Sequence, residues 1–146
     1  AASSYVTLRG GDLWVGKHTT GVLSLGTMYR YNITRSGNLS KRYKASMLTP
    51  SQVQGAVFSG SHVIYSRSYG RRNASTITVT DLEAGRSASF RAPSMTQGAT
   101  IADGWYYLTT ESGASVYKNN EDGKGYALNP ISKVHYASVR GLKGLA

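Results

Sequence analysis

The residues that could do acid–base or metal chemistry are few in this sequence. It has three histidines, His18, His62 and His135, and seven carboxylates that stand mostly in turn-like contexts. It contains no Gly-x-Ser-x-Gly elbow, no His-Glu-x-x-His pair and no phosphate-binding Gly-x-x-x-x-Gly-Lys loop. The lack of cysteine excludes a thiol nucleophile, disulfides and any Cys-based zinc site. We therefore expect no catalytic residue, no metal ion and no cofactor, and we interpret the histidines as packing or surface residues.

Glutamine recurs at one position of the sequence. Gln54 and Gln97 each precede a Gly-Ala pair, and Gln52 lies two residues before Gln54. A glutamine that is repeated in this way can hydrogen-bond the neighbouring repeat. It can equally belong to a rim that binds a partner or is enzymatically modified. Both interpretations fit the recurrence of the residue.

One loop combines positive charge with aromatic surface. Its sequence runs from Arg67 to Asn73, and it includes Tyr69, Arg71 and Arg72. Arginine and tyrosine anchor protein interfaces well, because they offer planar hydrogen bonding and large rigid area. We predict that Arg67, Tyr69, Arg71 and Arg72 are the residues best placed to contact a partner, with a plain solvated turn as the alternative.

The composition sets limits on the partners and the class of protein. Seventeen basic residues against seven acidic ones give a net charge of +10, which favours polyanions or acidic protein surfaces. The basic residues are scattered and form no nucleic-acid-binding arm, so we expect no nucleic-acid partner. No apolar run approaches the roughly 18 residues of a membrane helix, so we expect no membrane partner. The low-charge surface rich in Tyr, Ser, Thr and Gly is typical of exported bacterial proteins, and we predict a secreted, extracellular location.

An internal repeat defines the elements that carry these residues. The segment 50–56 returns as 93–99, an offset of 43 residues, which is the length of one β-propeller blade. The same offset places 63–66 on 106–109, and after a three-residue deletion it places 75–77 on 115–117. A more diverged copy has 11–15 in the place of 60–64. The sequence therefore predicts three copies of one structural unit.

Each copy is predicted to form four short strands separated by turns. In the middle copy we expect strands near 53–59, 62–67, 75–80 and 88–91, with breaks at 59–60, 70–74 and 83–85. We expect an all-β β-propeller with about three four-stranded blades, near 5–48, 51–92 and 94–131. The segment 133–139 is predicted to be a closing strand or the first strand of a next blade.

The second strand of every copy is apolar without interruption. Leu13-Trp14-Val15, Val63-Ile64-Tyr65 and the run from Trp105 to Leu108 lack the alternation of a strand with one wet face. Both faces of each sheet must be covered, as they are in stacked blades. Propellers close with about four to eight blades, so three blades leave two faces uncovered. We expect the remaining blades to come from a larger parent chain, a second chain produced by nicking, or a second copy in a homodimer.

The texture of these blades resembles that of secreted actinobacterial β-propellers. The resemblance lies in the segments 11–18 and 28–33 and in the two Gln-Gly-Ala copies, each followed by a turn and an apolar strand. It implies a seven-bladed, non-enzymatic ring that engages an extracellular metalloprotease and serves as a glutamine donor for a transglutaminase. Gln52, Gln54 and Gln97 would then be the candidates for cross-linking in this chain.

The leading functional prediction is therefore a secreted protein-binding propeller. A carbohydrate-binding propeller is the second, with stacking faces supplied by Trp14, Trp105, Tyr106 and Tyr107, for which packing between blades is the alternative. A third is a propeller hydrolase whose catalytic groups lie mostly in blades outside this chain.

Overall fold

Three antiparallel sheets make up the structure, which is a computed structural model and describes residues 4–21 and 23–146. The first sheet has the order β1-β2-β3-β4, from strands Tyr5–Arg9, Asp12–Gly16, Gly26–Asn32 and Ala45–Thr49. The second has the order β5-β6-β7-β8, from Val53–Ser59, His62–Arg67, Ser75–Asp81 and Arg86–Ala92. The third has the order β11-β10-β9, from Thr96–Ala102 (β9), Trp105–Thr110 (β10) and His135–Ser138 (β11).

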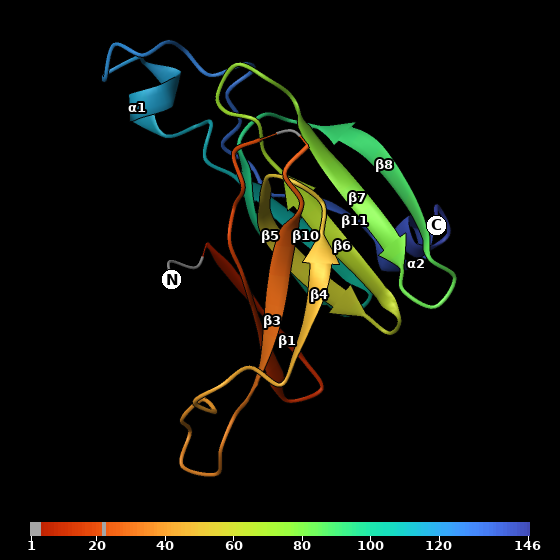
Figure 1. The fold of residues 1–146 in the computed structure, drawn as a ribbon. Coiled ribbons are helices and arrows are strands. Elements are labelled where there is room, and N and C mark those ends of the chain that lie inside the picture. The colour runs from red at the N-terminus through yellow and green to blue at the C-terminus, as the bar shows by residue number, and fades with distance from the viewer. Residues whose placement is uncertain (1–3, 22) are drawn as a thin grey trace.

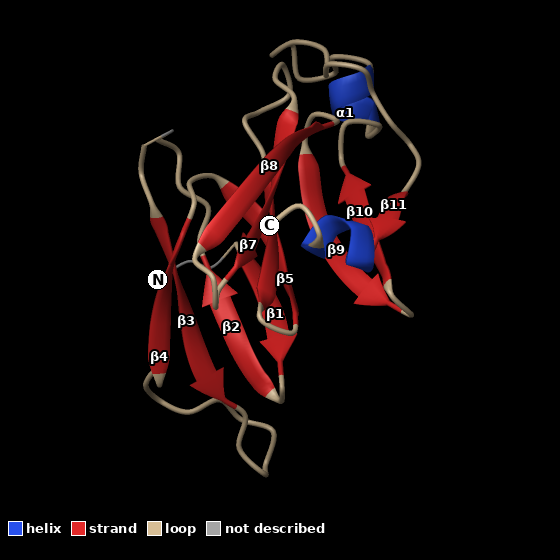
Figure 2. Cartoon of the chain, turned by 90° about the vertical axis from the view of Figure 1, so that its right-hand side faces the viewer, coloured by secondary structure: helices blue, strands red, loops and turns tan. Residues whose placement is uncertain are grey.

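The sheets fan out from their first strands. β1 lies beside β5, and β5 lies beside β9, while the later strands of each sheet diverge (Figures 1 and 2). In Figure 2 the second sheet stands between the first and the third. The all-β prediction is confirmed, and the three antiparallel meanders stand side by side in an arc. The described residues do not close this arc into a ring.

The 43-residue repeat is visible in the backbone. Gln52 and Met95 occupy equivalent positions before β5 and β9, and both have a left-handed conformation, with φ of 59° and 61°. The backbone N–H of Ser68 donates to the Gln52 carbonyl at 3.0 Å, and that of Glu111 donates to the Met95 carbonyl at 3.1 Å. The same local geometry thus starts both inner strands, and the four strands of the middle copy lie within about two residues of their predicted bounds.

Two apolar cores separate the three sheets. β6 serves both of them, because Val63 and Tyr65 pack toward the first sheet while Ile64 packs toward the third. The first core contains Tyr5, Trp14, Met28, Val53, Ala56, Val63 and Tyr65, and the second contains Val57, Ile64, Ile77, Val79, Tyr106, Leu108, Val139 and Leu142. The uninterrupted apolar run of β6 is therefore explained by burial on both faces, as predicted.

Two short helices flank the third sheet. α1 (Ser115–Lys118) lies in the connection from β10 to β11, and α2 (Val139–Lys143) follows β11. α2 contributes Val139 and Leu142 to the core between the second and third sheets, beside β7 and β11. Figure 2 shows it between these sheets. Neither helix approaches the length needed to cross a membrane.

The third copy has three strands in its sheet where four were predicted, and it differs from its prediction in two places. Residues 115–117 were expected to form its third strand, but Ser115–Lys118 is helical, with the N–H of Lys118 donating to the Ala114 carbonyl at 2.8 Å. The third strand is β11, from the segment 133–139 that was expected to close the ring or begin a next blade. The chain between β10 and β11 makes a long excursion, and contacts to the loop after β6 hold that excursion in place. Local strand propensity does not detect such long-range contacts.

Glycine allows the second and third sheets to approach closely. A Cβ built on Gly55 in β5 would lie 2.6 Å from the backbone carbonyl oxygen of Gln97 in β9. The hydroxyl of Ser66, fully buried, donates to the same carbonyl at 2.8 Å. The repeat-equivalent glycine, Gly98, faces no further sheet of the described chain, and the one described atom that a Cβ there would meet is Thr109 Oγ1 at 3.9 Å.

We predict that Gly55→Ala destabilises the chain by about 1–3 kcal/mol, because the new methyl group meets backbone that cannot move aside without separating the inner strands. The measurement is the free energy of unfolding from urea denaturation. Gly98→Ala is the matched control, with an expected change within about 1 kcal/mol, because the site is open and Ala loses less backbone entropy on folding. Equal losses in the two variants would contradict the close approach of β5 and β9.

Candidate functional site

The outer face of the first sheet is apolar and uncovered. Trp14 and Met28 point into the core, so their neighbours along β2 and β3 point away from it. The register pairs Val15 with Tyr29, and Tyr29 is 37% exposed. The same face includes Val6 and Leu8 of β1, Leu13 of β2, Tyr31 of β3 and Leu48 of β4. A sheet face of this composition is the kind that another layer covers.

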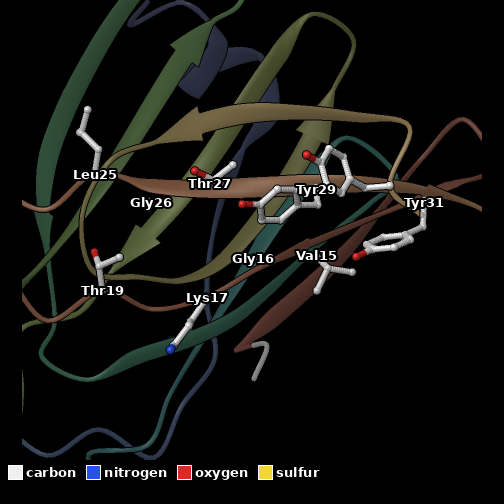
Figure 3. Close-up of a pocket in the computed structure, with 10 residues that line it drawn as sticks. Val15, Gly16, Lys17, Thr19, Leu25, Gly26, Thr27, Tyr29 and Tyr31 are labelled. Atoms are coloured by element: carbon white, nitrogen blue, oxygen red, sulfur yellow. The ribbon is translucent and has the colours of Figure 1, made fainter. Parts of the chain in front are cut away.

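A cavity of about 560 Å³ lies on this face. Figure 3 shows Tyr29 and Tyr31 from β3 along one wall, with Val15 and Lys17 nearby. The ring of Tyr43, from the β3–β4 loop, lies 4.8 Å from that of Tyr29 at an interplanar angle of 55°. Sequence reasoning missed these tyrosines, although the alternation of Tyr29 and Tyr31 in β3 places those two on one face of a strand.

The outer face of the third sheet is aromatic. Tyr106 and Leu108 fill the core, so Trp105 and Tyr107 point to the opposite side of β10. Tyr107 pairs in register with Tyr136 of β11, and the ring centroids of Trp105 and Tyr136 lie 5.5 Å apart in an edge-to-face arrangement. Trp105 is 42% exposed and Tyr136 is 68% exposed. The chain thus has an uncovered apolar surface at each end of its arc.

These placements divide the four aromatic residues predicted to stack on sugars. Trp14 and Tyr106 are buried in the two cores, at 5% and 3% exposure, and cannot stack on a ligand. Trp105 and Tyr107 lie on the outer face of the third sheet. The packing interpretation thus holds for Trp14 and Tyr106, and Trp105 and Tyr107 have surfaces that a partner can reach.

The basic loop after β6 uses two of its arginines internally. Arg67 donates from Nε to the Ser51 carbonyl at 2.9 Å and from Nη1 to Thr78 Oγ1 at 3.2 Å. Tyr69 is half-buried beside Arg67, with its ring centroid 6.0 Å from the guanidinium carbon. Arg72 is exposed. Among the four predicted partner contacts, Arg72 is the cation whose charge faces solvent most freely.

Arg71 anchors the excursion that carries α1. Its guanidinium binds both carboxylate oxygens of Asp122, at 2.9 and 2.8 Å, and lies 4.7 Å from the ring centroid of Tyr117. It also donates to the Gly125 carbonyl at 2.9 Å. A bidentate pair with this geometry fixes both position and orientation. Arg71 is therefore a structural clamp between the second sheet and the excursion of the third.

The shifted pKa values belong to structural groups. The hydrogen bonds from Arg71, and then the backbone N–H of Lys124, hold the pKa of Asp122 well below its usual range, while Asp122 raises the pKa of Arg71. Backbone N–H groups of Ala84 and Glu83 lower the pKa of Asp81, which closes the β7–β8 turn. Burial raises the pKa of Tyr5 to about 12 and also raises the pKa values of Tyr65 and Tyr106. None of these shifts prepares a general acid or base for work near neutral pH.

The three histidines lie in three different local environments. His18 Nε2 lies 3.3 Å from the Ser68 carbonyl oxygen, and His62 Nε2 lies 3.8 Å from Asp81 Oδ2. His135 is exposed at the start of β11. Within the described ranges, no three His, Asp or Glu side chains come together as a metal-binding group.

The repeated glutamines lie at the end of the arc where the inner strands begin. Gln54 and Gln97 are half-buried, and Gln97 Nε2 donates to Glu111 Oε1 at 2.9 Å. Gln52 is 8% exposed, and its Oε1 is buried with no hydrogen-bond partner in the part of the chain that the structure describes. The three side chains line one cavity together with His18 and Glu111, although sequence reasoning did not single out Glu111.

Comparison with known proteins adds no assignment. No protein-family model matches the chain, and a search of curated proteins finds no match.

We predict that Asp122→Asn releases the β10–β11 excursion while leaving the sheets folded, because the amide cannot receive both guanidinium hydrogen bonds as a charged pair. Limited trypsin digestion should cut after Lys118 and Lys124 several-fold faster, with little change in the urea midpoint. Since the pKa of Asp122 is lowered in the folded chain, the wild-type clamp should persist from neutral pH to below the usual carboxyl range. Glu121→Gln removes the same charge from an exposed neighbour, and equal digestion of both variants would contradict the clamp.

Proposed function

We propose that this chain provides three blades of a larger β-propeller that acts as a non-enzymatic, protein-binding scaffold. The observation that carries the proposal is the pair of uncovered apolar faces at the two ends of the arc. The middle sheet also has apolar side chains on both faces, and the two neighbouring sheets bury them. Further blades, from another chain or from a parent segment, would cover the end faces in the same way.

The third sheet supports completion by additional polypeptide. It has three strands where the other two sheets have four, and β11 pairs with β10 alone among the described strands. An edge strand with free backbone groups readily accepts another strand. Gly98 supports completion as well. It is the repeat equivalent of Gly55, whose Cβ position faces the third sheet, and the corresponding side of Gly98 is open. We propose a complete ring of seven blades, the number that the resemblance implies.

A scaffold role is favoured over catalysis by what the polar groups do. The strongest ion pair, between Arg71 and Asp122, holds a loop, and Arg67 ties the β5 turn to β7. The exposed Arg72 and the half-buried Tyr69 remain for a partner on the same loop. A net charge of +10 would steer the scaffold toward acidic protein surfaces.

The physiological partner in this proposal is an extracellular protease. As in the secreted propellers that the sequence resembles, the chain would be exported, engage a metalloprotease and donate glutamine to a transglutaminase. Gln54 and Gln97 are the more suitable donors, since they are half-buried while Gln52 is nearly enclosed.

A carbohydrate-binding function is the second candidate, and one observation favours it. The 560 Å³ cavity on the first sheet is lined by Tyr29, Tyr31 and Tyr43 and by Lys17. Aromatic faces stack on sugar rings, and a cation suits an acidic cell-wall polymer. In a completed ring, however, this cavity would lie between blades.

We predict that the native particle shortens the lifetime of a co-incubated extracellular metalloprotease, measured by residual peptidase activity and by gel analysis of self-digestion. Arg72→Ala should weaken the effect about tenfold in the concentration required, because an exposed arginine at an interface is a frequent anchor. Arg86→Ala, which removes an exposed charge at another turn, is the matched control.

Three results would redirect the proposal. An unchanged protease lifetime would contradict engagement of this partner. Binding to an array of acidic glycans, lost in Tyr29→Ala, would favour the carbohydrate alternative. Turnover of ester or lactone substrates by the particle would overturn the non-enzymatic role.

A further inference from the structure

A polar cavity lies at the axial end of the arc where all three sheets meet. It has a volume of about 300 Å³, at the lower end of the range for ligand pockets. Its walls come from the turns before β5 and β9, from those two strands, and from the segments after β2, β6 and β10. They consist of His18, Thr20, Gln52, Gln54, Ser68, Gly70, Met95, Gln97 and Glu111.

The internal repeat makes this cavity asymmetric. Gln54 and Gln97 are equivalent residues, and so are Ser68 and Glu111, at the offset of 43. In the third sheet Gln97 donates to the Glu111 carboxylate at 2.9 Å. In the second sheet Ser68 stands where that carboxylate would be, and the side chain of Gln54 has no hydrogen bond to the described residues. The cavity therefore contains the side-chain amide of Gln54, which lacks the carboxylate partner that its repeat equivalent Gln97 has.

Two acceptor atoms around this space have no donor among the described residues. Glu111 Oε1 receives the bond from Gln97, and Oε2 receives none from the described residues. Gln52 is nearly enclosed, and its Oε1 is buried with no hydrogen bond from residues 4–21 or 23–146. A carboxylate offers about four lone-pair sites, of which one is used here. A buried acceptor left unpaired costs free energy, so a ligand that brings donors would stabilise the arrangement.

The charge of the cavity is opposite to that of the chain. The chain has 17 lysines and arginines, yet the lining residues that the structure describes include neither type. Glu111 is their one carboxylate. A small ligand with several donors, no acceptor and a positive charge matches these walls, and a primary ammonium group has three donors and no acceptor.

We infer that the axial cavity binds a primary ammonium group of a peptide, with Glu111 as its counter-ion and the amide oxygens of Gln54 and Gln52 as further acceptors. The group can come from a lysine side chain or from a chain N-terminus, since the two share this chemistry. The inference deepens the proposed protein-binding function and rests on it. The proposed site would hold a cationic group of the partner at the axial end of the arc, separate from the end faces.

The test uses three short peptides titrated into the native particle by isothermal calorimetry at about 0.15 M salt, where long-range repulsion from the net charge is screened. Acetyl-Gly-Lys-Gly-amide presents only a lysine amine, and Gly-Gly-Gly-amide presents only an N-terminal amine. Acetyl-Gly-(Nε-acetyl-Lys)-Gly-amide presents neither. We expect one or both amine peptides to bind and the acetylated peptide to bind at least tenfold more weakly.

The variant Glu111→Gln should weaken binding of the amine peptides about tenfold or more, because it removes the charge and retains the shape. Glu83→Gln is the matched control, since it removes one exposed carboxylate at the β7–β8 turn and should leave affinity unchanged. Equal binding of the acetylated peptide, or unchanged affinity in Glu111→Gln, would overturn the inference. So would absence of binding by both amine peptides.

A second readout keeps the result separate from folding and from the proposed function. The methyl and amide NMR signals of Met95 and Gln54 should shift when an amine peptide is added to wild type, and should not shift in Glu111→Gln. Loss of the protease effect with peptide binding intact would contradict the proposed function alone. Retention of the protease effect without peptide binding would contradict only the axial site.

Discussion

Close packing of the inner strands is the constraint on which the rest of the structure depends. β5 approaches β9 so closely at Gly55 that a methyl group there would meet the Gln97 carbonyl at 2.6 Å, and the buried hydroxyl of Ser66 bonds that carbonyl. Strands that touch along one line while their sheets twist apart generate a fan, and the wedge between two sheets must then be filled by side chains. Two such wedges hold the apolar cores of this chain.

The same geometry explains why the two end sheets differ from the middle one. A sheet in a fan is buried on both faces only if it has a neighbour on each side, and among the described residues only the second sheet does. Tyr29 on one end and Tyr136 on the other therefore remain exposed, at 37% and 68%. We propose that further blades pack against these contiguous apolar faces. The axial cavity follows from the fan as well, because the starts of β5 and β9 and the segment after β2 converge there.

Sequence reasoning worked where the determinants are local and repeated. The bounds of β5 to β8, the burial of Val63, Ile64 and Tyr65 on two faces, and the equivalence of the two inner strands all follow from periodicity and turn residues. It failed at Ser115–Lys118, where the clamp between Arg71 and Asp122 overrides strand propensity across 51 residues of chain. The same clamp explains why Arg71, which was predicted to contact a partner, binds Asp122 within the chain. The axial cavity had a usable sequence signal, because Glu111 and Ser68 occupy equivalent positions in two otherwise matched repeats.

Native mass spectrometry of the particle formed under non-denaturing conditions tests the central claim most directly, which is that the end sheets require neighbours. The account predicts a mass greater than that of one copy of this 146-residue chain, from further copies, an unlike chain or a longer parent polypeptide. A folded particle that contains this chain alone, in a single copy, would contradict it.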